Sequence, residues 1–474
     1  MTRFYVTTPI YYVNDVPHIG HSYTTIIADI IARWNRLKGR NVFFLTGTDE
    51  NSVKTVRAAK ENGYQDIKKY ADEMVEKWKN VWKILNISNT DFIRTTEKRH
   101  ADTVKDFFNK VYKNGDIYKG TYEGLYCEGC ENFLTKSELI GGLCLYHKTK
   151  PKSISEENYF FRLSKYQQRL EQFFKENPDF IQPKSRMNEV VSFLKTGLKD
   201  VSISRPNLEW GIELPIDKNQ RIWVWFDALI NYISGGNWPA DLHILGKDII
   251  RFHCIIWPAM LMSVGEKLPK KIYVHGFFTA NGQKISKSLG NAIDPVALAE
   301  KYSVDALRYF FIREIPMGED GDFSEKALIE RINGELVSDL GNLVNRVVTI
   351  GEKFAGKIEG KDELSSKLNL DKIEELMEGF QFHLAIKEIF NFIRECNRYI
   401  NQKEPWRLKD KELGHVLYNL AEALRVIAVL LHPFMPETSE KIRQQLGLKE
   451  LGHIKFGKFK GKIKKGELLF RKVK

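Results

Sequence analysis

Residues 3–46 contain the pattern that decides the fold of this chain, and they read RFYVTTPIYYVNDVPHIGHSYTTIIADIIARWNRLKGRNVFFLT. Residues 3–12 are rich in β-branched and aromatic types and predict a strand. After a turn, the apolar residues of 21–37 follow helical spacing, and residues 41–46 predict a second apolar strand. A strand, a helix and a strand in succession are typical of a βαβ unit, so we expect a parallel sheet with a right-handed crossover.

The residue pattern changes at several points further along the chain, and these changes predict its organisation. A short glycine-rich stretch that begins near residue 116 contains three of the five cysteines, which is typical of an insertion. The α/β pattern resumes at residue 221, gives way to helical periodicity beyond residue 322, and ends in a basic tail. We therefore expect an α/β domain with a parallel sheet, split by an insertion and followed by an α-helical bundle.

The composition is that of a soluble globular protein, with 43% apolar and 28% charged residues. No stretch approaches the roughly 18–20 consecutive apolar residues of a membrane helix, and the first residues lack the pattern of a secretion signal. Five cysteines in 474 residues are too few for a disulfide scaffold. We expect a cytoplasmic protein without a membrane partner, in which Cys254 and Cys396 are small buried residues.

The net charge of +12 is concentrated near the end of the chain. Residues 453–474 contain nine Lys and Arg and one acidic residue, Glu467, and apolar residues are interleaved with these charges. The interleaving indicates a tail that packs on the preceding domain. Its charge is compatible with a polyanionic partner such as RNA, and a solvated tail is the alternative.

The segment between the first predicted strand and the first predicted helix contains His18-Ile19-Gly20-His21. The backbone N–H groups at a helix N-terminus attract anions, and a glycine lets a ligand approach the backbone closely. Two histidines three residues apart face the same side and can donate hydrogen bonds to phosphate. Taken alone, the same residues are typical of histidines that cap the helix.

A basic motif, Lys284-Ile285-Ser286-Lys287-Ser288, follows the last predicted strand. Two lysines in a small polar loop can neutralise charge that develops on phosphoryl oxygens during phosphoryl transfer. Taken alone, this motif is also typical of a solvated basic loop.

The insertion contains the ligand spacing of a metal site. Two residues separate Cys127 from Cys130, and two residues separate Cys144 from His147. Three thiolates and one imidazole form a closed tetrahedral shell for Zn²⁺ and leave no open position for a substrate. We expect one structural zinc ion there.

Two apolar stripes recur with helical spacing, so the residues of each stripe share one helix face. By spacing alone, both are ordinary core stripes. They consist of Trp225, Ala228, Leu229 and Tyr232, and of Ile249, His253 and Trp257.

The histidine and lysine motifs together resemble the paired signature of class I aminoacyl-tRNA synthetases. Further motifs resemble the methionyl-tRNA synthetases among them, over nearly the whole chain. These motifs are TTPIYYVN at 7–14, SEENYFFRLS at 155–164, VWFDAL at 224–229, GKDIIRFH at 246–253 and WPAML at 257–261. The cysteines and His147 match the single zinc knuckle of some members.

The resemblance implies that methionine and Mg²⁺-bound ATP form methionyl-adenylate, which is then transferred to the 3′ end of initiator and elongator tRNA(Met). It implies catalytic roles for His18, His21, Lys284 and Lys287, and ATP binding by His18, Gly20, His21, Gly246, Lys247, Asp248 and Lys287. The implied domains are a Rossmann-like catalytic domain in two halves (1–115 and 221–262), a connective insertion (116–220, with the knuckle at about 122–150), a lysine-loop region (263–330), an α-helical anticodon-binding domain (331–452) and the basic tail (453–474).

The resemblance also implies the amino-acid and anticodon sites. Both stripes, with Ile10, Tyr12 and Asp49, would line the methionine pocket, where Asp49 would pair with the ammonium group and the Tyr232 hydroxyl would meet the sulfur. A hydrogen bond to sulfur would help to reject leucine-like rivals, because an apolar pocket discriminates a methylene by only about 1–3 kcal/mol. Asn342, Arg346 and Trp406 would read the anticodon, the last by stacking on a base. By pattern alone, these three are a capping pair and a core tryptophan.

The chain departs from the family pattern at three places. Ile285 stands where methionine is usual, Pro9 where some members have alanine, and Asn51-Ser52 where many have His-Gly. A C-terminal dimerisation domain that some members carry is not found, so we expect a monomer. Two alternatives stay open: another class I synthetase, for leucine, isoleucine, valine or cysteine, and a non-catalytic zinc-containing tRNA-binding relative.

Overall fold

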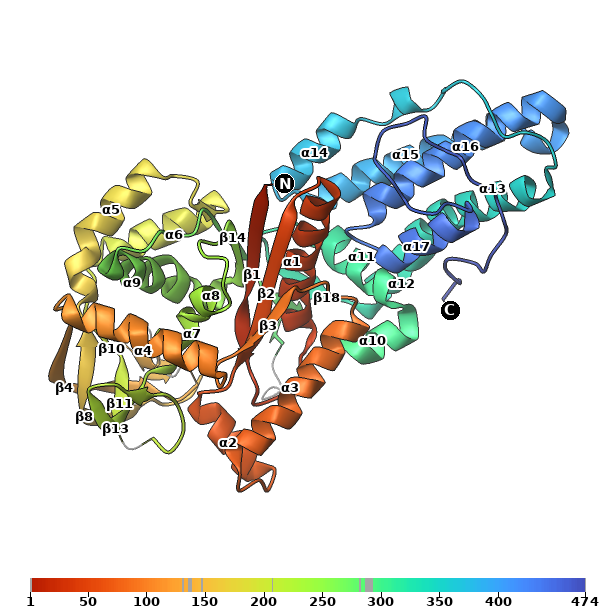
Figure 1. Ribbon diagram of the computed structural model, residues 1–474. Helices are drawn as coiled ribbons and strands as arrows, with labels where there is room; N and C mark the ends of the chain where they lie inside the picture. The colour runs from red at the N-terminus through yellow and green to blue at the C-terminus, as the bar shows by residue number, and fades with distance from the viewer. Residues whose placement is uncertain are drawn as a thin grey trace. The chain divides into compact units, whose positions relative to one another are not determined.

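The computed structural model describes residues 2–129, 132–134, 139–145, 148–206, 208–280, 283–285 and 293–473. The chain forms two compact units, whose elements are labelled in Figure 1. The sheet unit contains Met1–Val16, Asn41–Asn80 and Asn89–Val274, and the helical unit contains Pro17–Arg40, Val81–Ser88 and His275–Lys474.

A six-stranded sheet forms the centre of the sheet unit. Its order is β3-β2-β1-β14-β15-β9. β1 pairs in parallel with both β2 and β14, and β2 pairs in parallel with β3, which confirms the predicted parallel sheet. The strands are β1 (Arg3–Tyr12), β2 (Asn41–Asp49), β3 (Asp91–Arg94), β9 (Ile181–Gln182), β14 (Leu242–Gly246) and β15 (Ile272–His275).

Helices connect these strands in the order expected of an α/β fold. α1 (Ile19–Leu37) joins β1 to β2 in the chain, as predicted, and its contacts group it with the helical unit. The other helices before the helical region are α2 (Val53–Glu61), α3 (Ile67–Ile84), α4 (Lys98–Lys113), α5 (Gln167–Glu176), α6 (Lys184–Leu194), α7 (Val224–Leu229), α8 (Asn231–Ser234) and α9 (Trp257–Val264).

Most strands of the predicted insertion are antiparallel, whereas β9, which lies within its bounds, joins the six-stranded sheet in parallel with β15. One sheet has the order β10-β8-β4-β5, a second β11-β13-β12, and β6 pairs with β7. The long pair of this region is β4 (Ile117–Cys127) against β8 (Lys152–Phe161). The shorter strands are β5 (Asn132–Leu134), β6 (Leu139–Ile140), β7 (Leu143–Cys144), β10 (Val201–Ser202), β11 (Ser204–Pro206), β12 (Glu213–Leu214) and β13 (Asp217–Ile222).

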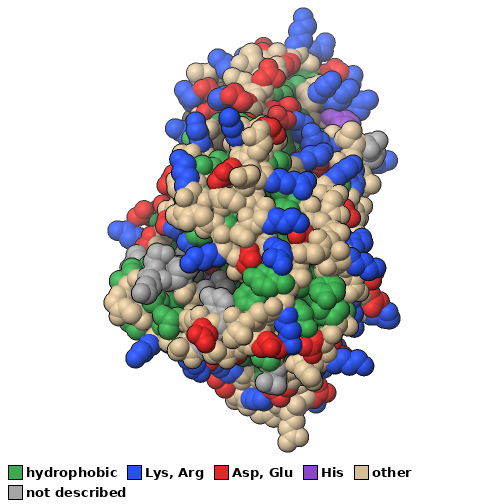
Figure 2. Space-filling model, turned by 90° about the vertical axis from the view of Figure 1, so that its left-hand side faces the viewer, with side chains coloured by type: hydrophobic (Ala, Val, Ile, Leu, Met, Phe, Trp, Pro, Cys, Tyr) green, Lys and Arg blue, Asp and Glu red, His purple; other side chains and the backbone are tan. Residues whose placement is uncertain are grey.

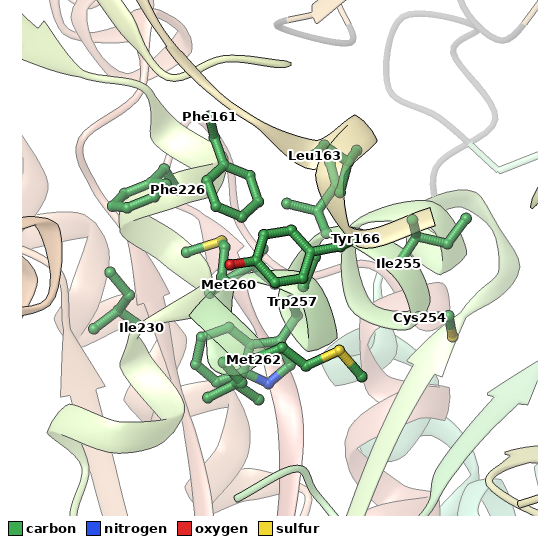
Figure 3. Packing of buried hydrophobic residues seen from close by; sticks show 14 of the residues in the cluster. Phe161, Leu163, Tyr166, Phe226, Ile230, Cys254, Ile255, Trp257, Met260 and Met262 are labelled. Carbon is green, nitrogen blue, oxygen red and sulfur yellow. The ribbon is translucent and has the colours of Figure 1, made fainter. Parts of the chain in front are cut away.

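One large apolar core joins this insertion to the second half of the sheet unit. Phe161 and Tyr166 from the insertion point toward Phe226 of α7 and toward Trp257 and Met260 of α9 (Figure 3). All five side chains are buried. The insertion is therefore packed on the sheet domain and is not a detached module.

The helical unit contains a small sheet of order β17-β16-β18, formed by β16 (Phe278–Ala280), β17 (Gln283–Lys284) and β18 (Gly321–Phe323). Residues 272–278, in the region where the α/β pattern was predicted to resume, contain two strands, β15 and the start of β16. Gly276 lies at this break, where an added Cβ would be 2.1 Å from the carbonyl oxygen of Glu319. The close approach of another backbone segment therefore interrupts the strand.

Helices make up the rest of the helical unit, where α13, α15 and α16 pack together (Figure 1). Within the region of predicted helical periodicity, α12 continues through a π-helical segment, Ile332–Gly341, into α13, so the three form one continuous helical run. The helices are α10 (Pro295–Tyr302), α11 (Val304–Glu314), α12 (Glu325–Arg331), α13 (Asn342–Lys353), α14 (Leu370–Glu378), α15 (Phe382–Lys403), α16 (Asp410–Leu431) and α17 (Pro436–Gln445).

Within the described ranges, α16 is the one helix long and apolar enough to cross a membrane. However, 83% of its apolar stretch is buried inside the protein. Such burial is the behaviour of a core helix in a bundle.

The basic tail runs along the helical unit without forming helices or strands in its described part. The guanidinium group of Arg425, on α16, donates to the carbonyl oxygens of His453 and Lys455. Ile463 is buried against Gly351 of α13, where an added Cβ would be 2.6 Å from the isoleucine side chain. Specific contacts therefore hold the tail on α13 and α16.

On the face shown in Figure 2, Lys and Arg side chains are interspersed with Asp and Glu.

Candidate active site

The carboxyl edge of the six-stranded sheet gathers the predicted amino-acid residues. The chain passes from β1 to β2 on one side and returns with β14 on the other, so the strand order reverses at β1. Ligands of parallel α/β sheets bind at such a reversal, beyond the carboxyl ends of the strands. β1 ends with Ile10 and Tyr12, β2 ends at Asp49, and Tyr12 is in register with Asp49. Gly246 ends β14 at the same edge.

Buried polar contacts fix the chain around Asp49. The neighbouring Glu50 is fully buried, and its carboxylate accepts hydrogen bonds from the Nε and Nη2 atoms of Arg94, each at 2.8 Å. The Glu50 carbonyl oxygen also accepts the indole N–H of Trp210 at 2.8 Å. A bidentate pair of this kind restricts geometry strongly. The Asp49 side chain, 4% exposed, thus lies next to a rigidly held residue at the strand edge.

The two predicted stripes meet in the sheet unit. Leu229, Tyr232 and Trp257 belong to one buried cluster, and Tyr12 and Trp225 are among the partly buried residues that pack against it. Ile249 also borders this cluster, and Ala228 is buried beside Leu229 on α7. The structure therefore brings the two stripes and Tyr12 of β1 to one cluster, whereas Ile10 packs against a separate cluster with Tyr5, Leu45 and Ile93.

A hydrogen bond joins the polar members of the two stripes. The Tyr232 hydroxyl lies 2.7 Å from Nε2 of His253, whose Nδ1 lies 3.1 Å from the carbonyl oxygen of Ile249. A carbonyl only accepts, so Nδ1 carries the ring proton and Nε2 accepts the proton of Tyr232. Burial lowers the pKa of His253 to about 4, which keeps the ring neutral. Trp225, on the same stripe as Tyr232, stacks on Phe252 at 3.8 Å.

Two groups of polar residues beside the pocket were not found by the sequence analysis. His243, on β14, lies 2.6 Å from the Thr7 hydroxyl, and its ring is 4.2 Å from that of Tyr232. Burial lowers the pKa of His243 well below its usual value. The second group contains Asp227, which contacts His100 and Asn51. A histidine inside the apolar strand β14 and an aspartate inside an apolar stripe were the available signals.

The histidine motif lies at the N-terminus of α1, in the helical unit. Nδ1 of His18 accepts the backbone N–H of Gly20, and Nδ1 of His21 accepts that of His18. The two rings stack with centroids 3.8 Å apart. An added Cβ on Gly20 would lie 2.9 Å from the His18 ring, so a larger residue there would displace that ring. Because both Nδ1 atoms accept, each neutral ring carries its proton on Nε2 and can donate from that side.

The lysine motif lies partly outside the described residues. The backbone of Lys284 pairs with Thr279 between β16 and β17, and Ile285 is buried. Ser286, Lys287 and Ser288 lie outside the described residues. The chain resumes at Ile293, whose carbonyl oxygen accepts the backbone N–H of Ile19 at 3.1 Å. The segment that follows the lysine motif thus returns to the N-terminus of α1. In the sheet unit, Lys247 and Asp248 form a short 3₁₀ helix directly after β14.

The structure describes half of the predicted zinc ligands. Cys127, at the end of β4, and Cys144, in β7, are both buried in a small cluster with Leu134. Cys130 and His147 lie outside the described residues. The hairpin strands therefore bring two predicted thiolate ligands, 17 positions apart in sequence, into one cluster, which fits a shared metal ion.

The predicted anticodon residues lie on the surface of the helical unit. Trp406 is 54% exposed, so it is not a core tryptophan. The Arg346 guanidinium group lies over the Trp406 ring at 5.5 Å and donates to Oδ1 of Asn401 at 2.7 Å. Asn342 is exposed four residues before Arg346 on α13. Arg346 and Trp406 thus present a cation and an aromatic face together, which suits a stacked base.

Comparison with known families agrees with this geometry. The family model described as tRNA synthetases class I (M) matches residues 4–150 and 135–348, and the anticodon-binding domain of tRNA ligase matches 365–468. The methionine–tRNA ligase of Caldanaerobacter subterraneus subsp. tengcongensis is 47% identical over 99% of this chain and 79% of its own length. That of Thermotoga maritima is 48% identical over 94% of this chain and 76% of its own.

Solved structures show the same relationship. Mycobacterium tuberculosis methionyl-tRNA synthetase in complex with methionyl-adenylate is 37% identical, with a TM-score of 0.93 and coverage of 99% of this chain and 100% of that one. The apo form of that protein has a TM-score of 0.85 at 35% identity, over 100% of this chain and 99% of that one. These matches favour neither another amino-acid class nor a binding module that lacks the catalytic fold. The chain belongs to the methionyl-tRNA synthetase family of class I aminoacyl-tRNA synthetases, which are ligases.

Proposed function

We propose that this chain activates methionine with Mg²⁺-bound ATP and transfers the methionyl group to the 3′ end of initiator and elongator tRNA(Met), as a cytoplasmic monomer. The observation that carries the proposal is the meeting of the two stripes at Tyr232 and His253 beside the carboxyl edge where Asp49 ends β2. This place offers apolar side chains and a carboxylate, which match a methionine side chain and its ammonium group.

In the first step, an oxygen of the methionine carboxylate attacks the α-phosphorus of ATP in line, and pyrophosphate leaves. In the second step, a terminal adenosine hydroxyl of the tRNA attacks the acyl carbon, and AMP leaves. Neither step requires a protein nucleophile. Positioning and charge stabilisation therefore supply most of the rate. Mg²⁺ that arrives with ATP neutralises part of the phosphate charge.

The histidines of α1 are proposed to hold phosphate oxygens through their Nε2–H groups. Their Nδ1 atoms are engaged with the backbone, so the rings are fixed with Nε2 as the donor side. Lys284 and Lys287 would neutralise charge on the transferring phosphoryl group, and Gly20 would allow close approach of the nucleotide. Support comes from Ile293, the first described residue after the lysine motif, whose carbonyl oxygen accepts the backbone N–H of Ile19 at the start of α1. Gly246, Lys247 and Asp248 would contact the nucleotide from β14.

The methionine side chain is proposed to lie among the two stripes, with Ile10 and Tyr12 at the strand edge and Asp49 on the ammonium group. Tyr232 would meet the sulfur. In the structure its proton is directed at His253, so a hydrogen bond to sulfur requires the hydroxyl to rotate about its C–O bond. The partner histidine would then keep only its hydrogen bond to Ile249.

A single structural zinc ion is proposed in the knuckle, held by Cys127, Cys130, Cys144 and His147. The burial of Cys127 and Cys144 in one cluster supports it. Anticodon reading is proposed for Asn342, Arg346 and Trp406, supported by the exposure of Trp406 beside a guanidinium group. The domain boundaries proposed with these sites are 1–115 and 221–262 for the catalytic domain, 116–220 for the insertion, 263–330 for the lysine-loop region, 331–452 for the anticodon domain and 453–474 for the tail.

ATP–pyrophosphate exchange without tRNA, measured with each of the twenty amino acids, tests the activation step. Exchange with methionine alone is expected. Exchange with a different amino acid would keep the class and contradict the pocket assignment, and no exchange in folded protein would contradict the activity. Lys287→Ala should lower exchange by roughly 10²–10³-fold with methionine binding unchanged in calorimetry. Equal losses of exchange and methionine binding would contradict a transition-state role for Lys287.

A further inference from the structure

Asn51 and Ser52, where this chain departs from the family pattern, have different roles in the structure. Ser52 caps α2, because its hydroxyl accepts the backbone N–H of Lys54 at 3.0 Å. Asn51 is 9% exposed, and its Nδ2 donates to Oδ2 of Asp227 at 2.8 Å and to the carbonyl oxygen of Thr95 at 3.2 Å. Only the first contact reaches the methionine pocket, because Asp227 is part of α7.

Asp227 is fully buried at the centre of this contact. It lies between Trp225 and Ala228, two residues of the proposed pocket, but on a different part of the helix surface. Its Oδ1 accepts a hydrogen bond from Nε2 of His100 on α4 at 2.6 Å, and Nδ1 of His100 meets the Ser234 hydroxyl at 2.7 Å. The two oxygens of Asp227 thus accept from His100 on α4 and from Asn51 in the loop between β2 and α2. In Figure 1, α4 and α8 lie beside α7.

A buried carboxylate needs these donors, because desolvation without compensating hydrogen bonds is costly. The two donors have different consequences. His100 ties Asp227 to α4, whereas Asn51 ties it to the end of β2, two residues after Asp49. The intervening Glu50 is directed to β3 through Arg94. Asn51 therefore connects the segment that follows the proposed ammonium partner to the pocket helix.

We propose that Asn51 is a positioning residue for methionine: through Asp227 it holds α7 at a fixed distance from Asp49. The inference rests on the proposed function, because it concerns the same amino-acid site. Asn51 does not contact the substrate in this account. It sets the distance between the apolar side chains of α7 and the Asp49 carboxylate, so that one methionine molecule can contact both.

Replacing Asn51 by alanine is the direct test. Loss of the donor leaves one oxygen of Asp227 without this partner, and α7 is free to shift relative to Asp49. The KM for methionine in ATP–pyrophosphate exchange is expected to rise roughly tenfold, since hydrogen bonds to charged groups are among the stronger ones. At saturating methionine, kcat and the KM for ATP should stay near wild type, because binding is weakened equally in ground and transition states.

Two further variants separate positioning from general stability. Ser52→Ala removes the cap of α2 next to Asn51, so it should lower the thermal midpoint without changing the KM for methionine. Asn51→Asp places a second carboxylate against Asp227 and should raise that KM further. Combining Asn51→Asp with Asp227→Asn restores one donor and one acceptor with the roles exchanged, and Oδ1 at position 227 can still accept from His100. The double variant should therefore recover a KM lower than that of Asn51→Asp.

These measurements distinguish a positioning role of Asn51 from a role in folding and from failure of the proposed function. If Asn51→Ala lowers kcat at an unchanged KM for methionine, the residue supports only the folded fraction and the inference is overturned. If the exchanged pair binds methionine no better than Asn51→Asp, the Asp227 contact is not the route. Wild-type protein without methionine-dependent exchange would instead overturn the proposed function, and the inference with it. Thermal midpoints measured for every variant show whether each is folded.

Discussion

Replacing Arg308 by methionine is expected to destabilise the helical unit strongly. Arg308, on α11, is fully buried. Its guanidinium group donates to Oδ2 of Asp29 at 2.6 Å, to the carbonyl oxygens of Phe434 and Pro433 at 2.9 Å each, and to that of Leu85 at 3.2 Å. One side chain thus joins α1, α11, the end of α3 and the turn between α16 and α17. Methionine fills a similar volume but offers none of these donors.

The magnitude follows from what remains around Asp29. Burial alone would raise the pKa of Asp29, but Arg308, Arg33 and Ser88 outweigh it and hold the pKa below its usual value. Breaking a buried ion pair by removing one partner costs about 3–5 kcal/mol. The Nε of Arg33 and the backbone and hydroxyl of Ser88 still donate to Asp29. We therefore expect a loss of about 3 kcal/mol, at the lower end of that range.

Urea unfolding, followed at the transition of the helical unit, measures this loss. Arg308→Lys keeps the charge but cannot serve the diverging carbonyl oxygens, so it should lie between wild type and Arg308→Met. Pairing Arg308→Met with Asp29→Asn should recover part of the loss, because the uncompensated charge is removed. A loss below about 1 kcal/mol for Arg308→Met, or strict additivity with Asp29→Asn, would refute the reasoning.

The same pair predicts the acid response of the helical unit. Because the pKa of Asp29 is lower in the folded than in the unfolded chain, the unfolded state binds more protons below about pH 4. Its contribution to stability is present above that pH and is lost as the pH falls through the folded pKa. Arg308→Met should therefore reduce the acid sensitivity of this unit.

Three other predictions test single groups. Trp406→Ala should reduce kcat/KM for tRNA charging by a factor that corresponds to about 1–3 kcal/mol of lost stacking energy. Because the ring is 54% exposed, ATP–pyrophosphate exchange and thermal stability should not change. A fall in exchange as well would indicate a structural role. The sheet unit should lose up to roughly 3 kcal/mol as the pH falls from 6.5 to 4, since the unfolded chain protonates His253 first; calorimetry of His253→Gln against pH should show a smaller loss. Emission spectroscopy should find one zinc ion per chain, lost in Cys127→Ser and retained in the control Cys254→Ala, whose thiol lies in a different core; retention in Cys127→Ser would contradict the ligand set.

Local sequence predicted the first strand, and the structure confirms residues 3–12 without change. It predicted β2 only as far as residue 46, whereas β2 continues to Asp49. Gly47 is a weak strand former by propensity. In the structure, an added Cβ on Gly47 would lie 2.0 Å from the carbonyl oxygen of Ile93, so the close approach of β3 requires glycine there. Pairing with β3 determines this last part of β2, so the residues of β2 alone do not predict it.

In the candidate site as well, local sequence predicts some features, and contacts between residues far apart in the sequence determine the others. Helical spacing indicated both stripes, but the structure divides the first between α7 and α8 and places the second on a 3₁₀ turn, a π-helical segment and the start of α9. Their meeting through Tyr232 and His253 depends on how α8 and the segment after β14 pack, and spacing carries no such information. Asn51 was noticed as a departure, but its partner Asp227 is 176 positions away and looked like one polar residue in an apolar stripe. A buried polar pair of this kind is recognised only when both members are seen together.

α1 belongs to the same unit as the residues proposed to read the anticodon. The histidines that would hold phosphate lie at its N-terminus, and two buried side chains of α1 contact the rest of the helical unit: Asp29 accepts from Arg308, and the Thr24 hydroxyl lies 2.8 Å from His275. Trp406 belongs to this unit as well. Residues proposed for phosphate and for anticodon are thus parts of one packed body, and the methionine pocket is part of the other. If that packing couples them, Arg308→Lys should change kcat for exchange through the position of α1 while the KM for methionine stays constant. A changed KM for methionine with constant kcat would show that Arg308 acts on the sheet unit instead.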